Sequence, residues 1–477
     1  MAIPVISVER MRAWEQATWD TGTSAASVIE QAGAALASRL RELTRPGARL
    51  LFLCGKGNNG ADAKAAAALL PDREAEVVDV DGPGARAALK ARLMEDLDWI
   101  VDGLFGIGLD RELSAEWSDL IDEINRSKHS VLAVDAPSGF HADLGRPMPT
   151  AMEASETVTF GAPKRGLLSG EAAKYVGRLT LASEIGLLPL DSEEFLLPET
   201  IEAEWVTEAD FRRFPPRRRS RSHKGTFGRL QIYAGSLGYA GAAVIAAKGA
   251  LRARPGIVSL ITSKNIFPLV AAQVPQALCF PSEREEEEPR PTAYLIGPGL
   301  AARDSSISGL KKKAIAAWKF AACPVVADAS ALDWLPESSS DPVGLRVITP
   351  HPGEAARLLG TDVASVEKDR FEAVRALSRK FGRVYVVLKG RQTLVGRCDG
   401  VIGVNSSGNP GLAQGGTGDA LAGLIAGLLA QPGVLSVADQ AIRYAVWFHG
   451  ACADRLSDRY GAWDVEDLLE MMKAPCG

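Results

Sequence analysis

Short apolar segments alternate with helix-like segments along the whole chain, and this alternation constrains the fold more strongly than any other feature. In the first half, apolar runs that predict strands occupy residues 50–54, 76–80, 99–103 and 130–135. In the second half, such runs occupy residues 229–234, 256–262, 293–296, 324–328, 346–348 and 384–388. Repeated strand–helix units build parallel or mostly parallel sheets with helices on their faces. Because 477 residues are too many for one ordinary core, the sequence predicts an α/β protein of two domains.

The composition excludes several classes of protein. Hydrophobic residues make up 46% of the chain and charged residues 24%, and the net charge of -5 argues against a general nucleic-acid binder. The six cysteines form no C-x-x-C pair and the five histidines form no H-E-x-x-H motif, which argues against zinc ribbons and disulfide scaffolds. No apolar run approaches the roughly 18 residues of a membrane span, and the N-terminus lacks the apolar core of a signal peptide. The sequence therefore predicts a cytoplasmic protein without nucleic-acid or membrane partners.

An arginine- and proline-rich segment separates the two halves. Residues 212–221 contain six arginines and two prolines, and prolines disfavour the interior of a helix or strand. We therefore expect residues 211–222 to form a solvated linker between a domain at 1–210 and a domain at 220–477. A basic edge that attracts phosphates is the alternative interpretation. A second charged run, at 282–291, predicts an exposed loop.

A glycine-rich turn follows the first apolar run. Residues 55–60 have the G-x-G-x-x-G spacing of a dinucleotide-binding turn, and the acids Asp79 and Asp81 lie about 20 residues further on. Such a turn lets a phosphate approach the backbone and presents free N–H groups at a helix start. However, Asn58 and Asn59 replace the small residues usual in a dehydrogenase, and their amide oxygens suit a cation or a sugar hydroxyl. The turn predicts a phosphorylated ligand but does not by itself predict redox chemistry.

Two further predicted strands of the first half end in an acid followed by a tight turn. Asp102 precedes Gly106 and Gly108, and Asp135 precedes Ser138. An acid at a strand end often only caps a helix, which is the simpler interpretation. Because the carboxyl ends of parallel strands meet at one edge of a sheet, three such ends carrying oxygen ligands predict a binding site there.

The first half resembles the NAD(P)H-hydrate epimerases, also called the YjeF N-terminal domain. The matching segments are "GKGNNG" (55–60), "VDGLFGIGL" (101–109), "VDAPSG" (134–139) and "TFGAPKRGL" (159–167), and with residues 11–33 the resemblance covers about 1–200. That family binds a nicotinamide nucleotide hydrated on its ring and interconverts the R and S forms. The resemblance implies a Rossmann-like, three-layer α/β/α domain.

The same resemblance implies two sets of site residues. Potassium would be held by Asn59, Asp102 and Ser138, whose oxygens suit a hard cation. The hydrate site would comprise Asn58, Asn59, Gly60, Ala61, Asp62, Gly106, Ile107, Gly108, Leu109, Asp110, Arg111, Glu112 and Asp135. Epimerisation of a carbon that bears a hydroxyl group and a ring nitrogen can proceed by loss and return of water through an iminium ion. Asp135 is the expected acid/base group for this step.

One departure from the family puts the epimerase activity in question. The family usually has "NNGGDG", whereas this chain has "NNGADA", with alanine at positions 61 and 63. If Ala61 or Ala63 occupied a position with positive φ, the strain would cost about 1 kcal/mol or more. An added methyl group would also crowd a ligand. The sequence thus leaves open whether the first domain is active.

The most informative motif of the second half is Gly415-Gly416-Thr417-Gly418, followed by a helix expected to begin at Asp419. Consecutive N–H groups in such a loop bind anions, and the helix dipole adds to this effect. An acid beside the loop would repel a phosphate unless it acts as a base or faces another group. A simple helix cap is the alternative interpretation of Asp419.

This motif resembles the ribokinase-like superfamily and, within it, the NAD(P)H-hydrate dehydratases. The matching segments are "HKGTFG" (223–228), "GSLGYAGAA" (235–243), "GPGL" (297–300), "TPHPGEAARLLG" (349–360), "VVLKGRQTLV" (386–395) and 408–431, so the resemblance covers about 220–475. It implies removal of water from the S-hydrate, driven by ADP with Mg²⁺, yielding AMP, phosphate and the reduced cofactor. Together the halves resemble a bifunctional repair enzyme, which implies a homo-oligomer whose substrates are the hydrates of NADH and NADPH.

The second resemblance also implies binding residues. ADP would contact Lys389, Gly390, Arg391, Gln392, Thr393, Asn409, Pro410, Gly411, Leu412, Ala413, Gln414, Gly415, Gly416, Thr417 and Gly418. The hydrate would contact Gly299, His351, Pro352, Gly353, Glu354, Ala355, Ala356, Arg357 and Asp419. The family often has "DADAL" where this chain has Ser330 in place of the second acid, a change that would weaken a metal or substrate contact.

The residue types suggest a mechanism for the second half. Asp419 would deprotonate the ring hydroxyl, which takes a phosphoryl group steadied by the 415–418 amides and Mg²⁺, and phosphate would then leave. His351 is either a proton carrier or a buried, hydrogen-bonded histidine, and Lys389 is a phosphate or strand-end contact. Glu354 is a candidate for positioning Mg²⁺ or substrate.

Two other functions are compatible with the anion-binding motif. One is a ribokinase-like kinase of a small molecule, such as a vitamin precursor, with an inactive accessory N-terminal domain. The other is a nucleotide-binding scaffold without activity. The segment at 349–360 and the fused first half favour the repair enzyme.

Overall fold

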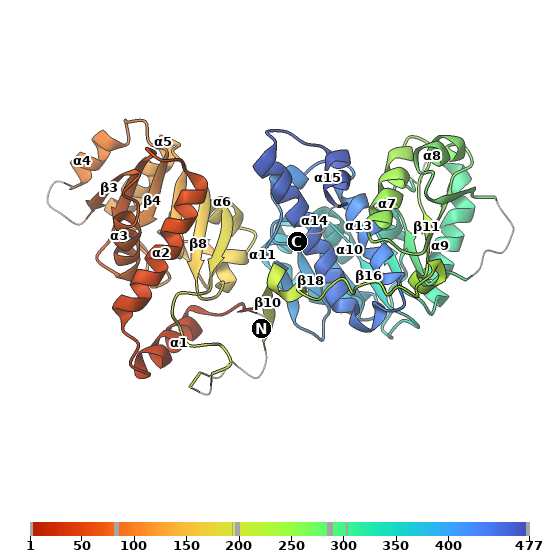
Figure 1. Cartoon of the computed structure of the whole chain (residues 1–477), viewed down its shortest axis with the longest axis horizontal. Coiled ribbons are helices and arrows are strands. Elements are labelled where there is room, and N and C mark those ends of the chain that lie inside the picture. The colour runs from red at the N-terminus through yellow and green to blue at the C-terminus, as the bar shows by residue number, and fades with distance from the viewer. Residues whose placement is uncertain are drawn as a thin grey trace. The chain divides into compact units, whose positions relative to one another are not determined.

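The computed structural model describes residues 3–80, 85–192, 194–195, 201–283, 290–301 and 304–473. Asp81, Cys476 and most of the charged run predicted as an exposed loop lie outside the described residues. The chain divides into two compact units, and the boundary falls between Ile201 and Glu202 (Figure 1). No helix in the described ranges combines the length and apolar character that crossing a membrane requires.

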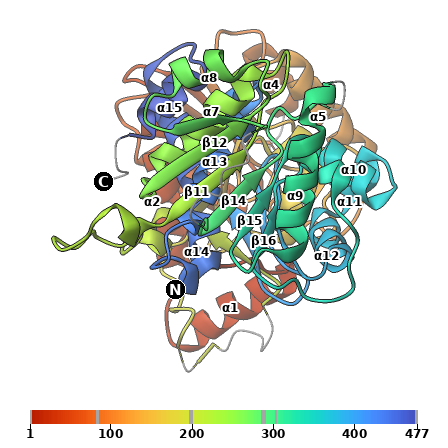
Figure 2. The same cartoon turned by 90° about the vertical axis from the view of Figure 1, so that its right-hand side faces the viewer.

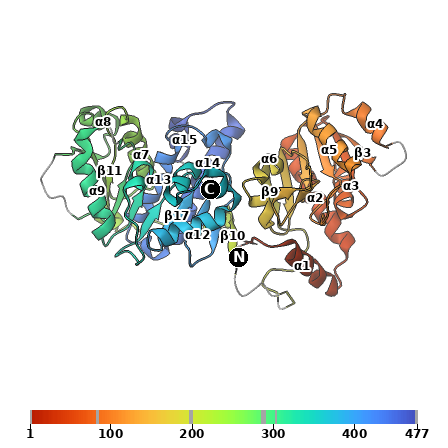
Figure 3. The same cartoon turned by 180° about the vertical axis from the view of Figure 1, so that it is seen from behind.

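The first unit is built on a parallel sheet. Its strands lie in the order β3 (Glu74–Asp79), β2 (Arg49–Cys54), β4 (Trp99–Gly103), β5 (Val131–Val134), β8 (Glu156–Phe160) and β9 (Arg178–Ala182). Short strands β1 (Ile3–Pro4), β6 (Phe140–His141) and β7 (Arg146–Pro147) lie outside this sheet. The helices are α1 (Val8–Asp20), α2 (Ala25–Leu43), α3 (Asn58–Ala68), α4 (Ala85–Arg92), α5 (Ala115–Ser127) and α6 (Ala172–Val176), and Figure 3 shows several of them from behind.

Helices cover both faces of this sheet. Along β2, Leu50 and Phe52 pack in one apolar cluster with residues of α2 and α3. The alternate residues Leu51 and Leu53 pack in a second cluster with residues of α5. Side chains alternate between the two faces of a strand, so a central strand that is apolar throughout must be covered on both sides. The first unit is therefore a three-layer α/β/α fold, as predicted.

The second unit contains a longer, mixed sheet. Its strands lie in the order β10 (Ala203–Val206), β19 (Ile402–Asn405), β18 (Leu394–Gly396), β17 (Tyr385–Leu388), β16 (Arg346–Ile348), β15 (Val325–Ala327), β14 (Ala293–Ile296), β11 (Arg229–Tyr233), β12 (Ile257–Thr262) and β13 (Leu278–Pro281). Only β18 runs antiparallel to its neighbours within this order.

Nine α-helices among the described residues of the second unit surround this sheet. They are α7 (Ala240–Arg252), α8 (Phe267–Gln273), α9 (Ser308–Phe320), α10 (Pro352–Leu359), α11 (Val363–Lys368), α12 (Arg370–Lys380), α13 (Thr417–Leu429), α14 (Ala438–Arg459) and α15 (Val465–Met471). Figure 2 shows α9 beside β14, β15 and β16. The guanidinium of Arg346 in β16 is fully buried. Its Nε donates a hydrogen bond of 2.7 Å to the carbonyl of Trp318, which connects the end of α9 to the sheet.

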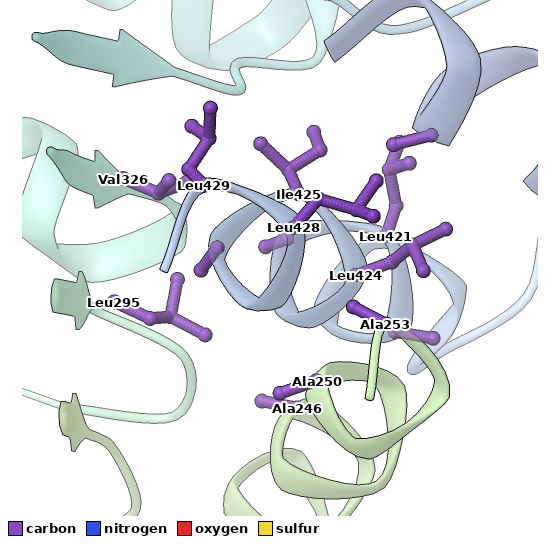
Figure 4. Packing of buried hydrophobic residues seen from close by; sticks show 14 of the residues in the cluster. Ala246, Ala250, Ala253, Leu295, Val326, Leu421, Leu424, Ile425, Leu428 and Leu429 are labelled. Atoms are coloured by element: carbon purple, nitrogen blue, oxygen red, sulfur yellow. The ribbon is translucent and has the colours of Figure 1, made fainter. Parts of the chain in front are cut away.

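Helix α13 lies in the centre of this unit and is buried on nearly all sides. Figure 4 shows its leucines and isoleucine between Leu295 and Val326 of the sheet and Ala246 and Ala250 of α7, with Ala253 just after that helix. Small residues let the two helices approach closely. A Cβ atom on Gly423 would lie 2.1 Å from the carbonyl oxygen of Ala246, and one on Gly249 would lie 2.3 Å from that of Ala420. This close packing fixes the start of α13, where Asp419 lies.

The position of the boundary corrects the sequence prediction. Strand β10 pairs in parallel with β19, so residues from 203 onward belong to the second unit and not to a first domain ending at 210. Within the expected linker, the buried rings of Phe211 and Phe214 contact Tyr444 at centroid distances of 5.4 and 4.9 Å. Only residues 215–221 are continuously exposed. The apolar side chains of the arginine-rich segment thus anchor it to the second core.

Candidate active sites

A cavity of about 900 Å³ lies at the carboxyl ends of β2, β4 and β5 in the first unit. Its polar lining comes from α1, from the loop after β2, from α3 and from the loops after β4 and β5. Of the residues expected to line the hydrate site, it contains Asn58, Asn59, Asp62, Gly106, Ile107, Gly108, Leu109, Asp110, Arg111 and Asp135. Gly60, Ala61 and Glu112, which were also expected there, are not part of this lining.

The glycines of the turn are required by close backbone contacts. A Cβ atom on Gly55 would lie 2.2 Å from the carbonyl oxygen of Leu104, and one on Gly60 would lie 2.0 Å from that of Gly55. Gly57 caps α3 without a side-chain hydrogen bond. The first N–H groups of the helix therefore remain available to an anion at the cavity.

Ala61 and Ala63 do not have the positive φ that the sequence analysis considered as a source of strain. Both lie inside α3, and neither has positive φ. The Ala63 methyl is fully buried and faces Gly103. A Cβ atom added to Gly103 would lie 2.7 Å from the Ala63 methyl carbon. The substitutions therefore fit the helix, and neither methyl group is among the atoms that line the cavity.

The three residues expected to bind potassium lie close together. Ser138 donates from its Oγ to one oxygen of Asp102 at 2.6 Å and from its backbone N–H to the other at 2.8 Å. Asp102 is fully buried, and burial raises its pKa to about 6 although the Ser138 hydrogen bonds lower it. The side-chain oxygen of Asn59 lies close to Gly106, since a Cβ atom added to that glycine would be 3.0 Å from it. The Nδ2 atom of Asn59 is buried and has no hydrogen-bond partner.

This donor set fits a hard cation. It offers carboxylate, hydroxyl and amide oxygens, and the two ends of the Asn59 amide exchange places by a simple flip. The buried amide without a partner indicates that something absent from the chain completes this site.

Asp135 is held by three donors on a single oxygen. Its Oδ1 accepts from Lys164 Nζ at 2.7 Å, from Thr159 Oγ1 at 3.1 Å and from the backbone N–H of Phe160 at 3.1 Å. The residue has φ of 63°, in the left-handed region. Lys164 is fully buried and was missed by the sequence prediction, although it lies within the segment "TFGAPKRGL". The arrangement leaves the other oxygen of Asp135 available to the cavity.

Two more carboxyl groups line the same cavity. Burial, followed by the negative charges of Asp135 and Glu15, raises the pKa of Asp62 to about 8. Burial, followed by the charge of Asp135, also raises the pKa of Glu15 on α1. Glu15 was not predicted, because nothing in the pattern of α1 indicates that this residue faces the loops after β2 and β5.

In the second unit, Asp419 lies in the first turn of α13, partly buried. Gly416 caps the helix with φ of 95°, and no side chain accepts a hydrogen bond from the first N–H groups. Burial and the nearby Asp328 carboxylate raise the pKa of Asp419 to about 7, although Lys389 lowers it. Among the described residues, none donates a hydrogen bond to the Asp419 carboxylate or forms an ion pair with it. The helix start therefore pairs free amides with a carboxylate that titrates near neutral pH.

Lys389 links Asp419 to two other acids. Its Nζ lies 3.0 Å from Asp328 Oδ1 and 4.0 Å from Glu354 Oε2, and a Cβ atom on Gly418 would lie 3.3 Å from it. Burial lowers the pKa of Lys389, but the carboxylates of Asp328, Glu354 and Asp419 outweigh this effect, and the net shift is upward. The family often has two acids in this segment, and this chain keeps the first, Asp328, and has Ser330 in place of the second. Asp328, the acid that is kept, is the one that contacts Lys389.

His351 serves as a helix cap. Its Nδ1 accepts hydrogen bonds from the N–H groups of Gly353 at 3.0 Å and Glu354 at 3.4 Å, and Glu354 Oε2 accepts from the His351 N–H at 2.9 Å. The side chain is 54% exposed, so it is not the buried histidine that was one of the two expectations. This capping box fixes the start of α10 and holds Pro352–Arg357 at the carboxyl end of β16.

The other residues expected at the hydrate and ADP sites of the second unit lie in three loops, and Gly299 is the one expected to contact the hydrate. Gly299 has φ of 64° and faces α7, since a Cβ atom there would lie 2.8 Å from that of Ala242. In the loop before α13, the side chains of Asn409, Gln414 and Thr417 all form hydrogen bonds within the loop or to Asp454. Gly415 has no neighbouring atom within 4 Å of a Cβ position and is exposed.

Two buried residues behind these loops were not predicted. Arg370 of α12 donates to the carbonyl of Arg391, and its Nη2 lies 3.4 Å from the carbonyl of Leu388, so it supports the turn at 389–393. His449 of α14 contacts the carbonyl of Thr417 at 3.0 Å, and burial lowers its pKa to about 4. Both lie in helices whose sequence periodicity indicates only packing.

The two sites define a class of protein. Each lies at the carboxyl ends of parallel strands, over a helix start with free amides, and each contains an acid whose pKa is raised by burial, Asp62 in the first site and Asp419 in the second. Such an arrangement is typical of an α/β enzyme that acts on phosphorylated ligands.

Comparison with known proteins specifies the family. Residues 230–474 match the NAD(P)H-hydrate dehydratase family, and residues 25–89 and 83–166 match the YjeF-related N-terminal family. The bifunctional NAD(P)H-hydrate repair enzyme Nnr of Coxiella burnetii is 35% identical over 479 residues, covering 95% of this chain and 94% of that protein. The enzyme of the same name from Escherichia coli is 37% identical over 454 residues, covering 89% and 85%. The chain therefore belongs to the family of bifunctional NAD(P)H-hydrate repair enzymes.

Solved structures resemble the second unit. The ADP/ATP-dependent NAD(P)H-hydrate dehydratase from Bacillus subtilis, co-crystallized with ATP/Mg²⁺, is 34% identical and covers 54% of this chain and 91% of its own, with a TM-score of 0.48.

Proposed function

We propose that the second unit dehydrates the S-hydrate with Asp419 as its base, and that the first unit interconverts the R- and S-hydrates with Asp135 as its acid/base group. As a bifunctional NAD(P)H-hydrate repair enzyme, the chain combines epimerase and ADP-dependent dehydratase activities. The relatives that span nearly the whole chain are repair enzymes, which favours this function over a small-molecule kinase with an inactive first domain.

The observation that carries the dehydratase proposal is the unpaired carboxylate of Asp419 beside free helix amides. Asp419 takes the proton of the ring hydroxyl, and the hydroxyl oxygen takes the β-phosphoryl group of ADP while AMP leaves. The amides at 415–418 and Lys389 stabilise the charge on the phosphoryl oxygens. The ring nitrogen's electron pair then expels phosphate, and loss of a proton from the neighbouring carbon gives the reduced nicotinamide.

Magnesium would bind here mainly through the nucleotide. Among the described residues, no group of three or more His, Cys, Asp or Glu side chains is arranged to hold a metal ion by itself. Magnesium usually keeps several waters and binds through one or two carboxylates together with substrate phosphates, and Glu354 and Asp328 offer such carboxylates. The bound ion would neutralise phosphate charge.

The epimerase proposal rests on the cavity above Asp135 and on the oxygen-rich pocket of Asn59, Asp102 and Ser138. Those three residues fit potassium, which would supply a fixed positive charge near the substrate phosphates. Asp135, which accepts a hydrogen bond from the buried Lys164, stabilises the iminium ion and accepts a proton from the returning water. The homo-oligomeric state and the cytoplasmic location stay predictions.

A single assay tests both activities. The full-length enzyme is supplied with purified S-hydrate and ADP, and the absorbance of reduced nicotinamide is followed, with ATP compared in parallel. Purified R-hydrate is then supplied with and without potassium. We expect ADP-dependent recovery of absorbance from S-hydrate and potassium-dependent recovery from R-hydrate.

The variant D419N is expected to lose at least about 100-fold in dehydratase rate while its ADP affinity, measured by calorimetry, changes little. The surface variant D458N serves as the matched control, because Asp458 is an exposed residue near the end of α14. Phosphorylation of a vitamin precursor without recovery of absorbance would instead support a kinase. An unchanged rate in D419N would exclude Asp419 as the base.

A further inference from the structure

The cavity of the first unit contains more carboxyl groups than binding a phosphorylated ligand requires. Anionic ligands are repelled by carboxylates, so these acids have another use. Asp62 on α3, Glu15 on α1 and Asp135 after β5 all line this one space. The charged groups around it, including Lys164 behind Asp135, are Arg12, Glu15, Lys56, Asp110, Arg111, Asp135 and Lys164.

Asp62 and Asp135 have opposite surroundings. Asp135 accepts three hydrogen bonds on one oxygen, one of them from Nζ of the buried Lys164. Asp62 is only 8% exposed, and within the described part of the chain no group donates a hydrogen bond to it or pairs with its charge. Two carboxyl groups in one cavity with such different environments are the pattern of an acid paired with a base.

We propose that Asp62 is a second catalytic residue of the epimerase, the acid that protonates the hydroxyl group of the hydrate, while Asp135 accepts a proton from the incoming water. This inference rests on the epimerase activity proposed above and deepens it.

The step balances without any other reactant. Asp62 gives its proton to the hydroxyl oxygen, the C–O bond breaks and its electron pair leaves with water. The lone pair of the ring nitrogen forms a C=N⁺ double bond. Water then adds to the other face of the carbon, the C=N⁺ π pair returns to nitrogen, and the released proton goes to Asp135. Exchange with solvent returns a proton from Asp135 to Asp62, and the reverse reaction uses the same two groups with their roles exchanged.

The pH dependence follows from the charges around Asp62. An acid must be protonated to act, and burial with the charges of Asp135 and Glu15 raises the pKa of Asp62 to about 8. The epimerase rate should therefore fall above about pH 8. Removing the charge of Glu15 lowers the pKa of Asp62, so the fall should begin at a lower pH.

The test measures R-to-S conversion by chromatography in the full-length enzyme without ADP, so that the dehydratase consumes nothing. At pH 7, D62N should lose about 100-fold or more in kcat/KM, the usual contribution of a general acid. Its residual rate should lack the fall above pH 8, and E15Q should shift that fall to lower pH. D119N is the matched control, because Asp119 is an exposed residue of α5 outside the cavity, and its profile should equal that of the wild type.

The outcomes separate this inference from the proposed function. Wild-type conversion with an unchanged D62N rate and pH profile would overturn the role of Asp62 alone. A fall above pH 8 that stays in place in E15Q would do the same, and this variant carries the test even where D62N fails to fold. Absence of R-to-S conversion by the wild type would overturn the epimerase function and the inference together.

Discussion

At the scale of single residues, the chemistry of the second site depends on the balance of charges around Asp419. Burial and the Asp328 carboxylate raise the pKa of Asp419 to about 7, and the ammonium of Lys389 opposes them. A base acts in its ionised form, so the dehydratase rate should rise with pH and level off above about 7. The same carboxyl group exposed to water would titrate near 4 and would be a much weaker base.

We predict that K389Q moves this rise to higher pH. The charge of Lys389 lowers the pKa of Asp419, so its removal raises that pKa and more base is needed to ionise the group. The measurement is kcat/KM for S-hydrate between pH 5.5 and 9 at saturating ADP. K312Q, which changes an exposed lysine of α9, should keep the wild-type profile. A K389Q profile that coincides with the wild type would show that Asp419 does not control the rate.

The residues that the sequence indicated and those that it missed differ in a simple way. Asp135 follows the strand β5, and Asp419 lies in the first turn of the helix α13. At both positions a local sequence pattern indicates a functional acid. Glu15 lines the cavity of the first unit from α1, and Lys164, from the segment after β8, contacts Asp135 from behind. Nothing local distinguishes these two from surface residues, because their roles come from neighbours far away in the chain.

At the scale of elements, the contact between α7 and α13 positions the catalytic helix. Gly249 on α7 faces the backbone of Ala420, the residue after Asp419.

The strand β8 illustrates why some elements were not predicted from the sequence. The sequence of β8, ETVTF, contains three polar residues, and each is satisfied by a distant partner. Glu156, for example, accepts hydrogen bonds from Arg39 at 2.5 and 2.9 Å. Without those partners in view, the segment does not look like a buried strand.

We predict that G249A destabilises the second unit by about 1–3 kcal/mol and lowers dehydratase activity. The added Cβ would lie 2.3 Å from the Ala420 carbonyl, so α13 must shift. In the same helix, G241A meets no atom within 4 Å and should be neutral or stabilising by about 0.5–1 kcal/mol. Calorimetric unfolding of the full-length enzyme compares the two. Equal stability of both variants would contradict the close packing of α7 and α13.

At the scale of the whole molecule, the chain consists of two units with separate cores. The boundary at Ile201–Glu202 assigns β10 and the arginine-rich segment to the second unit. Because each unit buries its own core, each activity should depend on the stability of its own unit.

We predict that F211A lowers the temperature at which dehydratase activity is lost and leaves epimerase inactivation unchanged. Phe211 is 6% exposed and packs on Tyr444 and Trp447 of α14, so its truncation leaves a cavity in the second core that costs about 3–5 kcal/mol. Phe320 is 75% exposed, so F320A is the control with little expected effect. Parallel loss of both activities in F211A would show that the segment supports both units.

The amino-acid sequence by itself determined the α/β class, the positions of the ten predicted strands and the family. These features depend on local periodicity and on motifs in which neighbouring residues act together. The tertiary structure alone decided the unit boundary, the fit of Ala61 and Ala63 in α3, and the protonation of Asp62 and Asp419. Burial and charge interactions set a pKa, and both depend on distances between residues that lie far apart in the chain.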